Sequence, residues 1–174
     1  MPAGATYEPL ATTTLTGTQS TIDFTSISGS YTDLVVSIYC QNAAATTGTR
    51  TGLLKLNSDS GTNYSYTSLN GDGATAASSR ATSQSAGIYY AELPRNGNGA
   101  NVFGFARISF FNYAGSTNKT ILSENSADLN GSGNVVRIVG LWRSTSAITS
   151  ISLIGGSEGF ASGTRATLYG IARA

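Results

Sequence analysis

The sequence predicts an all-β protein, a single antiparallel β-sandwich of the jelly-roll kind with about ten short strands. Three observations lead to this prediction. Apolar and polar side chains alternate along most of the chain, as Ile22 and Phe24 do within STIDFTS. Turns rich in glycine and asparagine, such as NGSG at 130–133, separate the alternating runs. No segment shows a sustained helical period, so helices are not expected to build the core.

The first four predicted strands are the runs at 20–26, 31–40, 52–57 and 63–69. Each is short, is bounded by turn residues and places its larger apolar side chains at every second position. Within each run, one face is predicted to hold the alternating residues: Ile22 and Phe24; Leu34, Val36, Ile38 and Cys40; Leu54 and Leu56, which point inward; and Tyr64 and Tyr66.

The next two runs, 87–93 and 101–113, are less regular. In the first, the adjacent Tyr89 and Tyr90 compete for the core side. The second carries apolar groups on both faces, with Ile108 on one and Phe105 on the other. A strand that is apolar on both faces is expected in the middle of a sheet or against a neighbouring subunit.

The last four predicted strands are the runs at 119–125, 134–142, 148–155 and 165–172. The polar corner RSTSA at 143–147 joins two of them. We therefore expect 134–155 to form a hairpin, with Trp142 as a packing anchor.

Two segments lack the strand pattern. Residues 72–86 are small and polar and are expected to form a long loop, with a helical turn as an alternative. Residues 1–14 hold two prolines and little apolar surface. They are expected to form an extended N-terminal arm that packs on a neighbour, or else a disordered tail, beside a sandwich domain at 15–174.

Composition excludes several functional classes. Histidine is absent and Cys40 is the single cysteine, so a histidine-based triad, an intrachain disulfide and a cysteine zinc site are excluded. The net charge of +1, spread along the chain, argues against nucleic-acid binding. No apolar run reaches the length of a membrane span, and the first residues do not resemble a secretory signal. Folding in the cytoplasm is expected.

Candidate chemistry is sparse. A glycosidase pair could come from the carboxylates of Asp23, Asp33, Asp59, Asp72, Glu92, Glu124, Asp128 and Glu158, but solvated faces and turns explain these residues more simply. In NSDSGTN, Asn57, Asp59 and Asn63 have the spacing of a calcium loop. Ser68 stands where the terminal glutamate would be, so a turn with Asx hydrogen bonds is favoured. We expect no catalytic residues, no cofactor and no metal.

Binding residues are expected among the larger side chains instead. Trp142 and Arg143 could form a sugar-stacking platform, although burial of Trp142 in the core or in a subunit interface is favoured. The full set of candidate interface residues is Tyr89, Phe103, Phe105, Trp142 and Arg143.

Several stretches also resemble a group of tailed-bacteriophage virion proteins, described as structural, tail-fibre-like or capsid-associated. The stretches are KLNSDSGTNYSYTSLNGDG, NYAGSTNKTILSENSADLNGSG, GLWRSTSAITSISL, the run TQSTIDFTSISGSYTDLVVSIY and the closing ATLYGIA. The resemblance extends from about residue 7 to the end of the chain. It implies a virion component built on a β-sandwich, and it supplies no catalytic residues.

Two roles fit this resemblance. The first and favoured one is a capsid decoration or cement protein that binds the major capsid protein on the outside of the head. The second is a receptor-binding module of a tail fibre or spike that contacts host surface glycans. In either role we expect a virion location, a homo-oligomer, and no enzymatic activity. A trimer is the expected oligomer because both faces of 101–113 are apolar.

Overall fold

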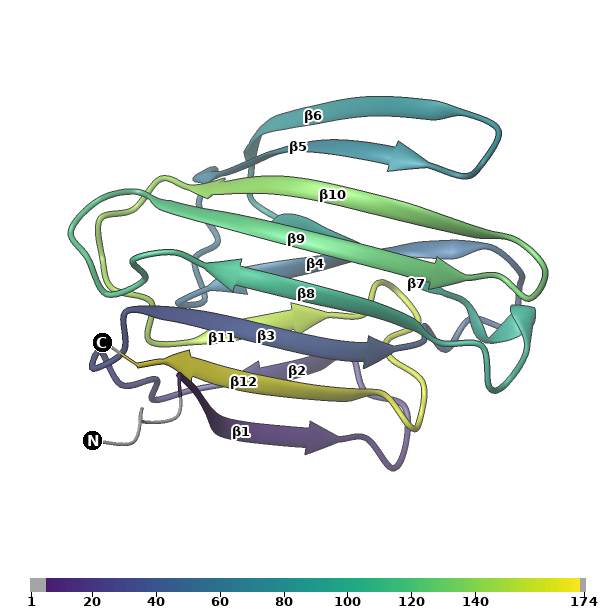
Figure 1. The fold of residues 1–174 in the computed structure, drawn as a ribbon, viewed down its shortest axis with the longest axis horizontal. Coiled ribbons are helices and arrows are strands. Elements are labelled where there is room, and N and C mark those ends of the chain that lie inside the picture. The colour runs from purple at the N-terminus through teal and green to yellow at the C-terminus, as the bar shows by residue number, and fades with distance from the viewer. Residues whose placement is uncertain (1–5, 173–174) are drawn as a thin grey trace.

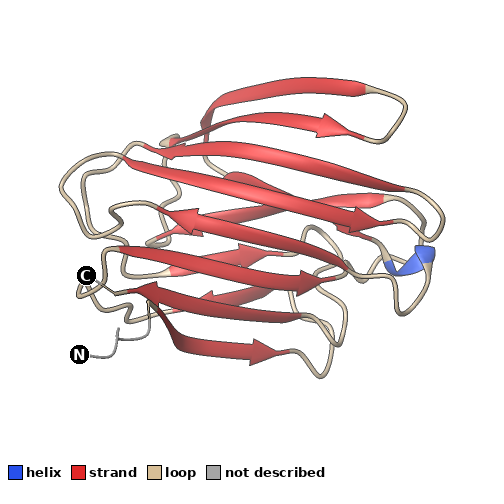
Figure 2. Cartoon of the chain, viewed as in Figure 1, coloured by secondary structure: helices blue, strands red, loops and turns tan. Residues whose placement is uncertain are grey.

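The computed structural model describes residues 6–172, and its regular secondary structure is almost entirely β-strand (Figures 1 and 2). A short 3-10 turn, η1 (Asn96–Asn98), lies between β7 and β8. The strands are β1 (Tyr7–Thr14), β2 (Thr21–Phe24), β3 (Asp33–Cys40), β4 (Thr49–Leu56), β5 (Tyr64–Gly71), β6 (Ala76–Gln84), β7 (Ile88–Pro94), β8 (Gly104–Phe110), β9 (Lys119–Asp128), β10 (Gly133–Trp142), β11 (Ile151–Ile154) and β12 (Arg165–Ile171).

These strands form two antiparallel sheets, so the predicted all-β sandwich is confirmed. The large sheet has eight strands in the order β1-β12-β3-β8-β9-β10-β5-β6. The small sheet has four, in the order β2-β11-β4-β7. In Figure 1 the large sheet lies in front of the small one, and the β5–β6 hairpin extends beyond it. Twelve strands replace the ten expected, because β1 and β6 join the large sheet.

The core lies between the sheets and follows the alternation seen in the sequence. Side chains at every second position of β3 and β8 are fully buried, among them Leu34, Ile38 and Ile108. The two sheets approach closely where Gly140 of β10 faces Ile88 of β7. A Cβ on Gly140 would lie 2.5 Å from Ile88 Cγ2, so a side chain at this position would push the layers apart.

The segment 72–86 does not form the expected loop. Most of it is β6, which pairs with β5 along a hairpin. Asp72 Oδ1 closes the turn by accepting hydrogen bonds from the amides of Ala74 and Thr75. Nearly every residue of β6 is exposed because the small sheet ends before it. A strand that buries neither face needs no apolar alternation, and for this reason the sequence pattern did not reveal it.

The N-terminal range 1–14 is extended where it is described, but it pairs within its own chain. Tyr7–Thr14 forms β1, which pairs antiparallel with β12, and a bulge lies between Pro9 and Ala11. Residues 1–5 lie outside the described residues. From residue 7 onward the expected arm is therefore an edge strand of the sandwich.

The expected hairpin over 134–155 is wrong. Strand β10 belongs to the large sheet, whereas β11 pairs with β2 and β4 in the small sheet. The connection between them crosses from one layer to the other, and Ile148 is buried on the way. A polar corner between two alternating runs suits either connection, so the local sequence does not distinguish them.

Candidate interaction surface

The outward-facing side of the large sheet, called here the outer face, carries most of the strongly exposed large apolar side chains of residues 6–172. It consists of the alternate side chains of β3, β5, β8, β9, β10 and β12, together with Tyr7 of β1. Its central members, by strand, are Val35, Ser37 and Tyr39; Thr67 and Leu69; Phe105, Arg107 and Ser109; Leu122, Glu124 and Ser126; Val135, Arg137 and Val139; Arg165, Thr167 and Tyr169.

Exposed apolar side chains concentrate on this face. Among the described residues, seven large hydrophobic side chains are strongly exposed, and six of them belong to the outer face: Tyr7, Tyr39, Leu69, Phe105, Val135 and Val139. Leu69 and Val135 are 61% and 62% exposed. Single exposed apolar residues are ordinary, but a gathering on one face marks an interaction surface.

A row of charges crosses the middle of the outer face. The strand register aligns Arg107 of β8 with Glu124 of β9, and Glu124 with Arg137 of β10. Glu124 Oε1 accepts an ion pair from Arg137 Nη2 at 2.7 Å. Arg107 Nη2 instead donates a hydrogen bond to the Tyr7 hydroxyl at 2.6 Å, and its guanidinium carbon lies 5.9 Å from the Tyr7 ring centroid.

Shallow hollows lie along this row. One hollow, of about 750 Å³, is lined by the apolar residues Leu69, Phe105 and Val135 and by the charged residues Arg107, Glu124 and Arg137. A second, of about 450 Å³, lies between Tyr7 and Tyr169 on the far side of Arg107. Arg107 borders both hollows, so the outer face is continuous from β5 to β1.

The predicted interface residues Phe103 and Phe105 both neighbour Tyr39 at one side of this face. Tyr39 is the cross-strand partner of Phe105. The Tyr39 ring also stacks on Phe103, with the ring centroids 4.6 Å apart and the planes 11° apart. Two of the predicted residues thus join an aromatic group with Tyr39.

The predicted residue Trp142 lies in the core, at what we call the Asp59 corner: Asn57, Asp59, Asn63, Tyr64 and Trp142. The indole is only 2% exposed, and its Nε1 donates to Asp59 Oδ2 at 2.6 Å. The Tyr64 hydroxyl, also buried, donates to the Asp59 carbonyl oxygen at 3.1 Å. Burial raises the pKa of Tyr64 to about 12. Trp142 anchors the packing and presents no ring for stacking on a sugar.

The NSDSGTN segment forms the Asx turn that was favoured over a calcium loop. Asp59 carboxylate oxygens accept hydrogen bonds from the Gly61 amide at 2.7 Å and from Asn63 Nδ2 at 2.9 Å. The hydrogen bonds from Trp142, Asn63 and Gly61 hold the pKa of Asp59 below its ordinary value. The carboxylate is therefore occupied by neighbours of its own chain.

Of the other two predicted residues, Tyr89 belongs to the small sheet, whereas Arg143 lies at the edge of the outer face, beside Ser65 of β5. Tyr89 is buried against Tyr66, and its hydroxyl donates to Glu92 Oε1 at 3.0 Å. Burial, and next the Glu92 carboxylate, raise the pKa of Tyr89. Arg143 is exposed beyond the end of β10 and donates from Nη1 to Ser65 Oγ at 3.0 Å.

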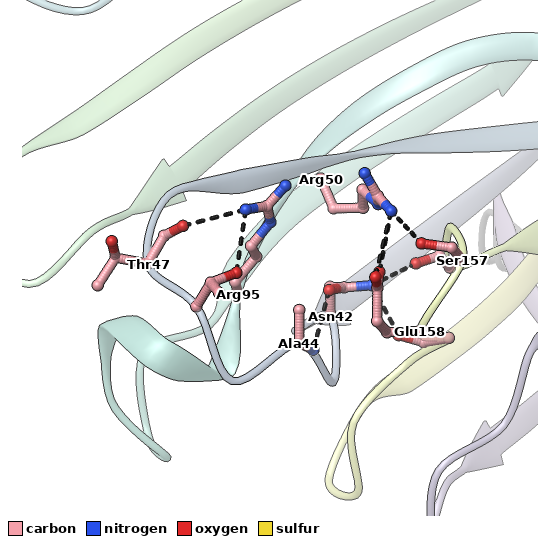
Figure 3. Close-up of polar contacts among 10 residues, drawn as sticks. Asn42, Ala44, Thr47, Arg50, Arg95, Ser157 and Glu158 are labelled. Carbon is pink, nitrogen blue, oxygen red and sulfur yellow. Dashed lines mark hydrogen bonds and ion pairs between the residues drawn. The ribbon is translucent and has the colours of Figure 1, made fainter.

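A polar cluster closes one end of the sandwich (Figure 3). Buried Asn42 donates from Nδ2 to the carbonyls of Gly155 and Gly159, and its Oδ1 accepts from the Ala44 amide. Arg50 points toward Ser157 and Glu158, with an ion pair to Glu158 at 3.2 Å (Figure 3). Because these contacts tie loops together, we interpret the cluster as structural.

The described part of the chain offers little for chemistry. No group of three or more histidine, cysteine, aspartate or glutamate residues among residues 6–172 could hold a metal ion. Cys40 is fully buried, and burial raises its pKa to about 12, so its thiolate is scarce near neutral pH. Among the same residues, no helix has the length and apolar character needed to cross a membrane.

Comparisons with known proteins add little. No protein-family model matches the chain, and no curated protein matches it. Among solved structures, the chain is similar to lysenin in a complex with phosphocholine, at 11% sequence identity and a TM-score of 0.16. The match covers 95% of this chain and 51% of the lysenin chain, so this chain spans about half the length of that neighbour. At that score the similarity supports no conclusion about fold or function.

Much of the outer face was not identified from the sequence. Leu69, Val135 and Val139 occupy the positions of their strands that alternation assigns to solvent. An apolar residue at such a position indicates a contact surface, and among the residues predicted for the interface only Phe103 and Phe105 correspond to this signal. The alignment of Arg107, Glu124 and Arg137 depends on long-range strand pairing, which has no local signature.

Proposed function

We propose that the chain is a structural protein of a tailed-bacteriophage virion, a decoration protein that lies outside the head and stabilises the shell. The resemblance of most of the sequence to virion proteins supports the setting. The outer face supports the mode of action, which is adhesion to a neighbouring protein of the shell. The virion is accordingly its proposed location, and the major capsid protein is a proposed partner.

The observation that carries this proposal is the gathering of six exposed apolar side chains on the outer face. Covering such a surface removes apolar area from water and stabilises the joined state. On a repeating lattice, many weak contacts of this kind combine through multivalency. Adhesion of this kind needs no reactive group, and we propose no enzymatic activity.

The second candidate is a receptor-binding module of a tail fibre. It is favoured by one observation, the aromatic group of Tyr39, Phe103 and Phe105 on the same sheet as Arg107. Aromatic faces bind sugar rings by apolar contact, and arginine supplies donors to sugar hydroxyls and acids.

A binding comparison separates the two candidates. Purified chain is mixed either with heads that lack it or with host cells, and the bound fraction is measured by sedimentation. We expect binding to heads, weaker binding in V139K because it disturbs the outer face and the multivalency that depends on it, and retention in the matched variant T51K on the small sheet. Binding to cells without binding to heads would contradict the decoration role and favour the fibre module.

Cryo-electron microscopy of whole virions tests the same proposal independently. Decoration predicts many copies distributed over the head surface. A few copies confined to the tail would overturn it.

A further inference from the structure

We propose that the occupant of the outer face is a second copy of this chain, bound face to face about a two-fold axis parallel to the strands. This inference rests on the proposed adhesive function and names the partner at that surface. The strand register, the charges and the size of the face carry it.

The axis is placed by the strand order. The middle of the large sheet lies between β8 and β9, with β3, β12 and β1 on one side and β10, β5 and β6 on the other. A two-fold axis parallel to the strands at this midline places β8 opposite β9 of the second copy, and β3 opposite β10. Because the axis runs along the strands, residues of one cross-strand row face residues of the same row.

The charged row becomes self-complementary under this operation. Arg107 faces Glu124 of the second copy, and Glu124 faces Arg107 in return. Within one chain, Glu124 is paired with Arg137, whereas Arg107 has only the Tyr7 hydroxyl and ring as partners among the described contacts. The second copy therefore supplies a carboxylate to a guanidinium that bonds only to a neutral group in the single chain.

The apolar rows also meet each other. In the row of Val35, Ser109, Leu122 and Val139, the operation places Val35 opposite Val139. In the row of Tyr39, Phe105, Ser126 and Val135, the operation places Tyr39 opposite Val135. The two most exposed valines of the face thereby meet apolar side chains, of which Tyr39 is half-exposed and Val35 is only 5% exposed in the single chain. Aligned sheets that pack face to face join in this way, with side chains of the two faces interleaved.

The other two-fold axis in the plane of the face is disfavoured. An axis perpendicular to the strands would place each strand opposite itself. Where that axis runs through the charged row, Arg107, Glu124 and Arg137 each face their own copies, so like charges meet in every position of the row. Like charges brought together away from water weaken association, and the charged row therefore selects the parallel axis.

The area of the face suits a stable dimer. The six strands that carry most of the outer face, about 4.8 Å apart and roughly 24 Å long, give a face of roughly 700 Å² per copy. Stable interfaces of standard size bury about 600 to 1,000 Å² per partner. A contact that covers most of the outer face is therefore large enough.

The first test is the mass of the purified full chain in solution. Light scattering or sedimentation at micromolar concentration should give twice the 17.8 kDa of one chain. V139K should weaken self-association by roughly 100-fold, because it places a charge in the centre of the apolar contact. The matched variant T51K should leave association unchanged. A monomer up to about 100 μM, a trimer, or equal behaviour of V139K and T51K would overturn the inference.

The second test uses the charges. E124R should weaken the dimer, because it sets arginine against Arg107 of the second copy. Reversal of the whole row in the triple variant R107E, E124R and R137E restores every opposite pair, within and between copies, and should recover association. Failure of the triple variant to recover, with its melting temperature unchanged, would contradict the proposed axis.

The outcomes for this inference and for the proposed function are distinguishable. A monomeric chain that still binds heads through Val139 would refute the second copy as occupant and leave the decoration role standing. A dimer that binds no heads would refute the decoration role and would leave the inference of a second copy at the outer face intact.

Discussion

The Asp59 corner and the outer face both place large apolar side chains near a carboxylate, and they do so in opposite ways. At the corner, the indole of Trp142 is buried, and its N–H meets a carboxylate that also accepts from Gly61 and Asn63. On the outer face, Leu69 and Val135 are mostly exposed. The corner is complete within one chain, whereas we propose that a second copy completes the outer face. Burial and bonded partners, more than residue type, distinguish structure from binding surface in this protein.

The largest expected effect comes from breaking the corner. W142A should lower the free energy of unfolding by about 4 kcal/mol, because it removes a buried aromatic side chain and leaves a cavity. Urea denaturation measures the change. V139A on the same strand is the control, with a change of about 0.5 kcal/mol or less. A similar loss in the two variants would contradict the distinction between corner and face.

The polar cluster around Asn42 at one end of the sandwich should show the next largest loss of folding stability on substitution. N42A leaves the carbonyl of Gly155 and the amide of Ala44 without their partner, whereas the Gly159 carbonyl still accepts from the Ala43 amide. We expect a loss of about 2 kcal/mol, since each unsatisfied buried group costs about 1 kcal/mol or more. The exposed N101A is the control. Unchanged thermal unfolding of N42A would show that this end does not depend on the amide.

A smaller and pH-dependent effect should follow from D59N. The pKa of Asp59 is lowered in the folded chain, so the ionised carboxylate contributes stability above its unfolded pKa. That contribution is lost as the pH falls through the folded pKa. D59N should therefore cost about 1 to 2 kcal/mol at neutral pH and progressively less in acid. A difference from wild type that stays constant from pH 7 to about pH 2 would contradict the role of the charge.

The smallest effect on folding is expected on the outer face itself. V135K and V139K should change the free energy of unfolding of the monomer by about 0.5 kcal/mol or less, because both side chains are already exposed. Their effect should appear in association alone. Chemical denaturation at low protein concentration measures the first quantity. A loss of more than 2 kcal/mol there would show that these valines support the fold of the single chain.

The sequence predicted what depends on local pattern. The sandwich follows from alternation, and the burial of Trp142 and the Asx turn at Asp59 follow from residue chemistry. It did not predict β6, because a strand exposed on both faces has no alternation. It also placed β10 and β11 in one hairpin, because a layer crossing has no local signature. Most of the outer face was not predicted either, because strand pairing assembles it from residues far apart in the chain.

Cysteine labelling of assembled particles tests most directly whether the outer face is covered by protein. The native Cys40 is buried, so labelling reports on an introduced thiol. We predict that V139C reacts readily in the dilute monomer and is protected in virions, whereas T51C on the small sheet reacts at a higher rate than V139C in virions. Equal, rapid labelling of V139C in the monomer and in virions would contradict the proposal that the outer face is a protein contact.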